Sequence, residues 1–190
     1  MMTARAQATA ETRRAILLAG LNRARETMSL DVPLADIAGR AGVSVQTVLR
    51  HFGSKEKLYR ELETFAREHV IGERSAPAGD VVAAVHALIG HYETTGDWAL
   101  AMLAQERRDE RAWQVTDQGR TVHRAWVRSV FAPQLSQRSP RHRGPLTDLL
   151  VVATDVYAWK LLRRDRGLQP AAVEQRIRLM VQALLSSVES

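Results

Sequence analysis

The side chains with the most distinctive chemistry follow one another closely between positions 44 and 55. The set joins hydroxyl, amide, cationic and apolar groups: Ser44, Val45, Gln46, Thr47, Leu49, Arg50, His51 and Lys55. Gln can bond bidentately with adenine, Arg with guanine, and apolar groups can contact the thymine methyl group. Hydroxyl, imidazole and ammonium groups can bind phosphate oxygens. The pattern is therefore typical of a helix that reads the DNA major groove.

Two short helices joined by a tight turn are expected to position these residues. Apolar residues recur at spacings of three and four in the first helix: Leu34, Ile37, Ala38 and Ala41. Gly42 suits a left-handed C-cap, and Ser44 is a good N-cap for a second helix. Val43 and Val48 can pack together across that cap. The sequence therefore predicts a helix-turn-helix over residues 34–52, with its second helix in the major groove.

The run IAGRAGVSVQTVLRHFGSKEKL, residues 37–58, resembles the N-terminal domain of the TetR family of bacterial transcriptional regulators. The family pattern is IA, two variable residues, AGVS, three helix residues, a bulky pair, HF, a turn, SKE and L. The resemblance implies that Lys55 contacts a phosphate and that Arg13 and Arg14 could touch the DNA backbone. Leu49 stands where many members carry Tyr, so one phosphate contact is expected to be lost.

Composition and charge limit the possible classes of protein. The chain has 190 residues, 45% of them hydrophobic, which is enough for a substantial core. It contains no cysteine, and no signal peptide or membrane-spanning run is recognisable, so a cytoplasmic location is expected. The net charge of +6 fits nucleic-acid binding, but residues 1–75 and 76–190 each contribute +3. Solvated helix faces would explain this even distribution equally well.

The chain as a whole predicts an all-α fold of about nine helices, with a small polar arm at residues 1–10. The predicted helices cover residues 12–27, two within 34–52, 55–74, 81–94, 98–108, 110–131, 146–164 and 170–188, with a basic loop at 132–145. Three parts are expected: a three-helix DNA-binding domain at 1–53, a connecting helix at 54–75, and an effector-binding and dimerisation domain at 76–190.

The last two predicted helices are apolar around most of their circumference. Their apolar residues are Leu149, Leu150, Val152, Ala153, Val156, Tyr157 and Leu161, then Val173, Ile177, Met180, Val181, Leu184 and Leu185. In the family, the last two helices of each subunit form a four-helix dimer interface. A two-fold homodimer would carry its recognition helices roughly 34 to 36 Å apart and read a palindromic operator. The alternative is a simple intramolecular core.

The family resemblance also implies a small-molecule pocket in the helical body. The candidate lining residues are Trp98, Met102, Trp113, His123 and Trp126. Aromatic residues and methionine at helical spacing also occur in ordinary cores, so the core interpretation stays open for each of them.

Motifs for catalysis or metal binding are not recognisable in the sequence. There is no HExxH, Gly-rich phosphate loop or nucleophile motif, and the acidic residues mostly alternate with Arg. His86 and His91, five residues apart, would point away from each other on a helix. No enzyme activity, cofactor or metal is therefore expected.

These observations together predict a DNA-binding transcriptional regulator, most simply a repressor that a small-molecule effector releases from DNA. Two alternatives stay open. One is a DNA-binding or architectural protein that responds to no ligand. The other is a small-molecule-binding or catalytic helical protein whose DNA-binding head is weak.

Overall fold

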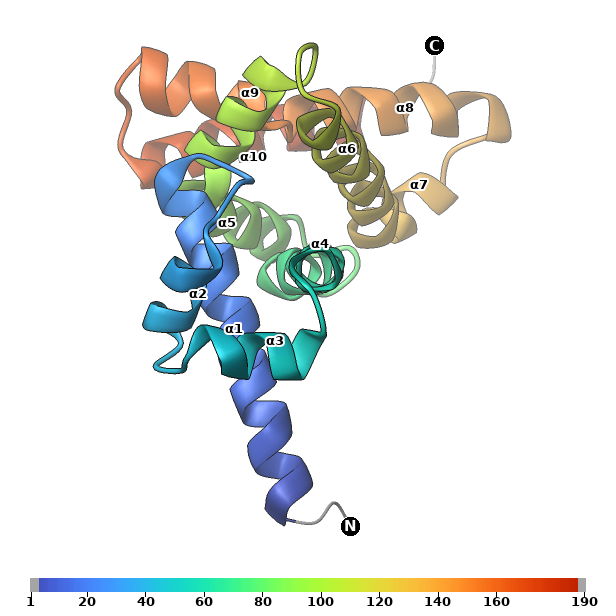
Figure 1. Cartoon of the computed structure of the whole chain (residues 1–190). Coiled ribbons are helices and arrows are strands. Elements are labelled where there is room, and N and C mark those ends of the chain that lie inside the picture. The colour runs from blue at the N-terminus through green and yellow to red at the C-terminus, as the bar shows by residue number, and fades with distance from the viewer. Residues whose placement is uncertain (1–3, 188–190) are drawn as a thin grey trace. The chain divides into compact units, whose positions relative to one another are not determined.

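The computed structural model describes residues 4–187, and helices make up most of them (Figure 1). No strand occurs in this part of the chain, so the predicted all-α class is confirmed. The chain forms two compact units, Met1–His69 and Val70–Ser190. The first is called the head below and the second the body. The boundary falls inside one helix.

The head contains α1 (Ala4–Thr27), α2 (Leu34–Arg40), α3 (Val45–Phe52) and most of α4 (Lys55–Glu73). Apolar side chains from all four helices and from the loop before α2 form its core: Ile16, Leu17, Ala19, Val32, Ile37, Ala38, Val48, Phe52 and Leu58. Figure 1 shows the first turns of α1 extending past α2 and α3, and their side chains are exposed.

The start of α1 corrects the expectation of a polar arm at residues 1–10. Residues 1–3 lie outside the described part, but the helix already begins at Ala4. Alternate alanines at positions 4, 6, 8 and 10 favour this extension because alanine has the highest intrinsic helix propensity.

The body contains α5 (Val81–Gln105), α6 (Glu110–Val130), α7 (Ala132–Ser136), α8 (Pro140–Ala153), α9 (Val156–Lys160), a π-helical segment η1 (Leu161–Asp165) and α10 (Pro170–Ser186). α5 lies against α6, α9 and α10, and α8 lies against α6 and α10. The largest fully buried side chains of this core include Trp159, Phe131, Leu88, Leu150 and Ile177.

The predicted break between residues 94 and 98 does not exist, because α5 runs without interruption to Gln105. Thr94 and Thr95 donate their hydroxyl hydrogens back to the carbonyl of His91, over 2.9 and 2.7 Å, within the helix. Gly96 leaves room for the Trp159 ring. Residues that suggest a turn in the sequence are therefore used for packing inside a helix.

The predicted loop at 132–145 is also wrong, because it contains α7 and the first turns of α8. Pro140 opens α8 at a position where no amide hydrogen is needed. The expected single helix at 146–164 is instead interrupted after Ala153. Thr154 ends α8, and the Asp155 carboxylate caps α9 by accepting from the amide of Tyr157 over 2.8 Å.

Candidate functional sites

The turn before α3 fixes where the second helix of the helix-turn-helix begins. Gly42 has a φ of 67°, a left-handed conformation that suits glycine. The Val43 amide donates to the Ala38 carbonyl over 3.0 Å, which closes the turn. Ser44 Oγ then accepts from the Thr47 amide over 3.1 Å and caps α3. The helix-turn-helix predicted over residues 34–52 is therefore present.

α3 has one buried face and one exposed face. Val48 and Phe52 are 0% and 4% exposed and anchor the helix in the head core. The outward positions form two rows at helical spacing, Val45 with Leu49 and Gln46 with Arg50. Within residues 4–187, the Gln46 and Arg50 side chains make no hydrogen bond or ion pair. Both rows are therefore available to a ligand in solvent.

The remaining residues of the predicted DNA interface lie at its edges. Thr47 and His51 are half-buried, and Thr47 Oγ1 lies 3.0 Å from Ser44 Oγ. Lys55 is the first residue of α4, and its Nζ donates to Asp31 Oδ1 over 3.2 Å. This hydrogen bond raises the pKa of Lys55. A phosphate that binds Lys55 would therefore have to share its ammonium group with Asp31 or displace the Asp31 carboxylate.

Arg13 is held inside the head. Its guanidinium lies 4.3 Å from the centroid of the Phe52 ring, donates to the His51 carbonyl and pairs with Glu61. These contacts join α1 to α3 and α4. The Arg14 side chain is exposed, so it is the freer of the two arginines considered for backbone contact.

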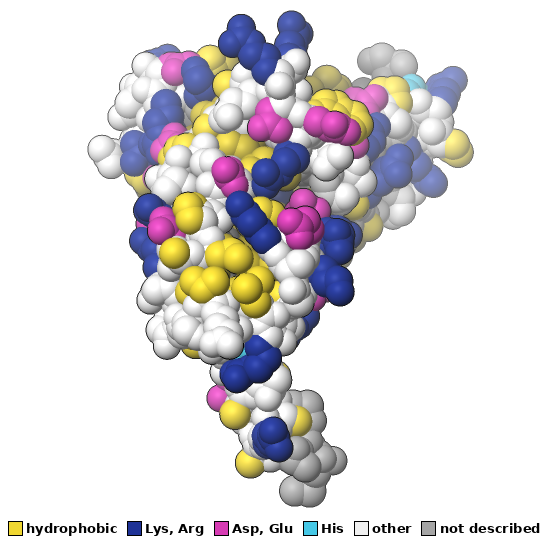
Figure 2. Space-filling model, in the orientation of Figure 1, with side chains coloured by type: hydrophobic (Ala, Val, Ile, Leu, Met, Phe, Trp, Pro, Cys, Tyr) yellow, Lys and Arg dark blue, Asp and Glu magenta, His cyan; other side chains and the backbone are white. Residues whose placement is uncertain are grey.

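Charge alone does not mark the interface. Figure 2 shows Lys and Arg side chains spread over the visible face, with Asp and Glu among them, as the even division of net charge suggested. The feature that singles out α3 is its combination of amide, guanidinium and apolar side chains on one exposed face.

Two of the five candidate pocket residues of the body are in direct ring contact. His123 and Trp126 stack on each other with ring centroids 5.6 Å apart. Met102 is buried, Trp98 is half-buried with its indole N–H unbonded, and Trp113 is half exposed. No hydrogen bond or ring contact in the described structure joins these three to the His123–Trp126 pair.

A buried polar cluster surrounds that pair and joins the end of α4 to α6 and α8. Arg74, the residue after α4, is 6% exposed, and its Nη1 lies 3.2 Å from His123 Nδ1. His123 Nε2 lies 3.1 Å from Thr154 Oγ1, which itself donates to the Leu150 carbonyl. The Trp126 indole N–H donates to the Arg74 carbonyl over 2.8 Å. These residues are called the Arg74 cluster below.

The hydrogen bonds of the cluster fix the protonation state of His123. The Arg74 guanidinium can only donate, so Nδ1 must accept. Thr154 Oγ1 gives its hydrogen to Leu150, so Nε2 must carry the imidazole proton. Burial, followed by the nearby charge of Arg74, lowers the pKa of His123 to about 4. His123 is therefore neutral at physiological pH.

A second set of buried polar groups lies beside the cluster. His91 Nδ1 is 2.7 Å from Glu73 Oε2, and its Nε2 is 3.0 Å from Thr95 Oγ1. The Tyr92 hydroxyl donates to the Thr154 carbonyl, and burial raises the Tyr92 pKa. These groups bring α4, α5 and the end of α8 together.

Sequence reasoning found His123 and Trp126 but missed Arg74 and Thr154. Nothing in the local sequence separates Arg74 from the other arginines, since it is simply the last residue of the helix predicted over 55–74. Thr154 lies in the middle of a segment that was expected to be one continuous helix. The interruption between α8 and α9 gives Thr154 its place, and only the fold reveals it.

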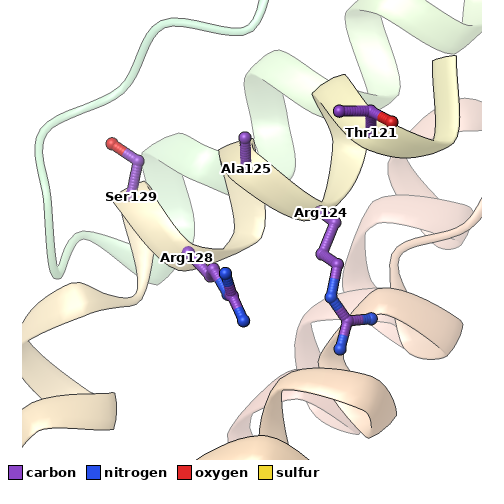
Figure 3. A pocket seen from close by; sticks show the side chains of 5 residues that line it. All are labelled: Thr121, Arg124, Ala125, Arg128 and Ser129. Carbon is purple, nitrogen blue, oxygen red and sulfur yellow. The ribbon is translucent and has the colours of Figure 1, made fainter. Parts of the chain in front are cut away.

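A separate hollow lies along the exposed side of α6, lined by Thr121, Arg124, Ala125, Arg128 and Ser129 (Figure 3). It is open to solvent, and Arg124 is already paired with Asp148 on α8. None of the five candidate pocket residues lines it.

Residues 4–187 contain neither a metal-binding cluster nor a membrane-spanning helix. No three His, Asp or Glu side chains in this range lie close enough together to hold a metal ion. No helix in the same range is long and apolar enough to cross a bilayer.

A capped helix-turn-helix followed by further helices is a known DNA-binding architecture. By its fold, this chain therefore falls in the class of helix-turn-helix proteins. Residues 30–62 match the family model described as bacterial regulatory proteins, tetR family. This match and the structural neighbours described next confirm the resemblance seen in the sequence: the chain has the DNA-binding fold of a TetR-family transcriptional regulator.

Among the solved structures with a similar fold, two match more than nine tenths of this chain. One is a transcriptional regulator from Rhodococcus sp. Rha1, with a TM-score of 0.63, 17% identity, and coverage of 91% of this chain and 95% of that one. The other, from Rhodococcus sp., is described as a TetR-family transcriptional regulator, with a TM-score of 0.65, 16% identity and coverage of 93% and 100%. At these identities the likeness concerns the fold. A search of curated proteins finds no match.

Proposed function

We propose that this protein is a sequence-specific regulator that binds a palindromic operator as a homodimer and is released by a small-molecule effector, most simply as a repressor. The observation that carries the DNA-binding part is the exposed face of α3. It offers an unbonded amide, an unbonded guanidinium and two apolar side chains on a helix anchored by a buried opposite face. A DNA-binding role implies that the protein acts in the cytoplasm.

Each residue of this face has a role in the proposal. Gln46 and Arg50 would pair bidentately with adenine and guanine, while Val45 and Leu49 would contact thymine methyl groups. The phosphate contacts would come from the remaining four residues: Ser44, Thr47, His51 and Lys55. The sequence preference would then depend on the four residues that contact bases. The position of the protein along the DNA would depend on the four that contact phosphates.

The proposed homodimer would form through α8, α9, η1 and α10. These elements expose six large apolar side chains, from 39% for Met180 to 69% for Val152: Leu149, Val152, Tyr157, Leu161, Leu179 and Met180. Leu149 and Val152 lie three apart on α8, and Tyr157 and Leu161 lie four apart, so each pair shares a helix face. Covering these faces with a second copy would remove apolar surface from water.

Release by an effector would follow from linkage between the two parts of the chain. In the proposed organisation, residues 1–53 bind DNA, 54–75 connect, and 76–190 bind the effector and dimerise. An effector that prefers a body conformation unfavourable for DNA binding must weaken DNA binding, and DNA must weaken effector binding by the same factor. α4 would transmit the change, because it is one helix from Lys55 to Glu73.

Fluorescence anisotropy would test the DNA-binding proposal. The purified protein is titrated onto labelled intergenic DNA beside its own gene and onto scrambled DNA of the same length, over a salt series. Specific binding at physiological salt is expected to exceed non-specific binding by ~10³-fold or more. Gln46→Ala and Arg50→Ala should each lower this ratio by about 5- to 100-fold, which corresponds to the loss of one bidentate base contact.

Gln114→Ala and Arg108→Ala are matched controls, because both side chains are exposed on the body. They should leave the ratio unchanged. If the wild-type protein shows no preference for its intergenic DNA, and selection from genomic fragments also yields no preferred sequence, the head is not a sequence reader. If DNA binds specifically but no metabolite in a screen releases it, the effector part of the proposal fails.

A further inference from the structure

Arg74 is a buried cation whose charge the nearby Glu73 carboxylate compensates only in part, because burial still lowers the Arg74 pKa. Its side chain is 6% exposed, its Nε has no hydrogen-bond acceptor, and it forms no ion pair with any residue from 4 to 187. Within residues 4–187, the side chain that hydrogen-bonds the guanidinium is His123, a neutral imidazole. Burial lowers the pKa of Arg74, which is the physical sign of a charge that is poorly solvated. A buried charge of this kind is costly unless an anion approaches it.

Oxygen atoms of the residues in and beside the Arg74 cluster make hydrogen bonds to groups other than the guanidinium. Glu73 Oε2 is hydrogen-bonded to His91. The Thr154 hydroxyl donates to Leu150, and the Thr154 carbonyl accepts from Tyr92. The Asp155 carboxylate accepts from the Tyr157 amide. The planar fork of a guanidinium matches the geometry of a carboxylate, so the unbonded Nε points to that class of ligand.

The surroundings of Arg74 also indicate what the rest of the ligand would contact. Trp126 stacks on His123, and Phe131 meets the Trp126 ring edge-on at 6.1 Å between centroids. These aromatic faces suit an apolar or aromatic body. We propose that the body binds a small organic acid whose carboxylate pairs with Arg74 and whose apolar part lies against Trp126. This inference rests on the proposed function, because it names the chemical class of the effector.

The same residue offers a route from the ligand to α4. Arg74, directly after α4, makes two hydrogen bonds to α6: its carbonyl accepts from Trp126, and its Nη1 donates to His123. A carboxylate bound to the guanidinium competes with His123 for these N–H groups. Arg74 would then lose its side-chain hydrogen bond to α6 and keep the one that its carbonyl accepts from Trp126. Lys55, a candidate phosphate contact, lies at the other end of this helix.

Thermal unfolding of the full-length protein without DNA tests the proposal. The probes are three carboxylates with their neutral amides: benzoate and benzamide, phenylacetate and phenylacetamide, octanoate and octanamide. When the concentration of the acid is about 100 times its Kd, at least one acid is expected to raise the Tm of the protein by roughly 5 °C. The corresponding amide should have no effect. Arg74→Gln should weaken the binding of that acid about tenfold or more.

Arg178→Gln is the matched control, because Arg178 Nε is also buried and unbonded but lies on α10. It should leave acid binding unchanged. The proposal is overturned if no acid raises the Tm more than its amide does, or if Arg74→Gln and wild type bind the acid equally. Since the assay contains no DNA, a protein that binds an acid but no operator would refute only the proposed function.

Discussion

At the scale of single residues, His123 shows how burial sets the chemistry of the body. Its imidazole accepts from Arg74 and donates to Thr154, so both ring nitrogens are used by the neutral form. Protonation would place a second positive charge beside the guanidinium in a buried site. His123 therefore resists protonation and acts as a fixed hydrogen-bond bridge between α4 and α8.

This resistance predicts a loss of stability in acid. The His123 pKa is about 4 in the folded protein and about 6.5 in the unfolded chain, so between these values only the unfolded state takes up the proton. The effect is absent above pH 6.5 and reaches about 3 kcal/mol of unfolding free energy at pH 4. Chemical denaturation of wild type and His123→Gln from pH 7.5 to 4 measures the difference, and the variant should lose less stability.

His86→Gln is the control for this experiment, because His86 is exposed on α5. It should show the same loss in acid as the wild-type protein. Parallel stability curves for wild type and His123→Gln would contradict the assignment of a neutral, buried His123.

At the scale of elements, α5 and α9 depend on a close contact between a glycine and a tryptophan. A Cβ atom at Gly96 would lie 2.5 Å from Trp159 Cζ3. Trp159 is fully buried, its indole N–H donates to Glu93 over 2.8 Å, and the Arg164 guanidinium lies 4.6 Å from its ring centroid. Because the Trp159 ring is held on several sides, moving it away from an added Cβ atom would cost free energy.

Gly96→Ala is therefore expected to destabilise the body although alanine is the better helix former. The clash should cost about 1 to 3 kcal/mol of unfolding free energy. Gly90→Ala lies on the same helix, with no atom within 4 Å of the added Cβ, and should stabilise by about 0.5 to 1 kcal/mol. Urea denaturation measures both, and a stabilised Gly96→Ala protein would show that Trp159 is free to shift.

At the scale of the whole molecule, DNA affinity should depend on the oligomeric state. One head offers one recognition helix, so a palindrome can be read at both half-sites only if two copies are joined. The exposed apolar faces of α8, α9, η1 and α10 are the surfaces proposed to join them. When two heads that each bind DNA weakly are joined, the second head binds its half-site intramolecularly. The overall affinity for the operator therefore increases.

Val152→Arg should disrupt this assembly, because Val152 is 69% exposed on α8 and would be covered in the dimer. Sedimentation should show a monomer, and operator affinity should fall roughly 10²-fold or more. The matched control is Val82→Arg on α5, where the valine is 48% exposed and lies outside the proposed interface. A dimeric Val152→Arg protein with full operator affinity would refute the proposed interface.

The DNA-reading part could be predicted from the sequence because its signals are local. Gly42 and Ser44 form the turn and the cap through contacts within six residues, and Val48 and Phe52 mark the buried face by their spacing. The structure agrees with each of these expectations. The roles of Gln46, Arg50 and the other outward residues stay predictions until DNA binding is measured.

The interruptions of the body helices were harder to predict, because the same residue types have two uses. Thr94, Thr95 and Gly96 resemble a turn, yet the threonines bond back within α5 and the glycine admits Trp159. Thr154 resembles a helix interior, yet it ends α8. In each case the neighbouring helix determines the outcome, and this neighbour is distant in sequence.

The sequence by itself therefore determined the all-α class, the helix-turn-helix and the set of side chains on α3, since caps and apolar periodicity act between residues a few positions apart. Only the tertiary structure decided that Arg74, His123 and Thr154 meet. They lie 49 and 31 positions apart and come from three elements. Their buried hydrogen bonds exist because helix packing brings them together and excludes water, which no local pattern encodes.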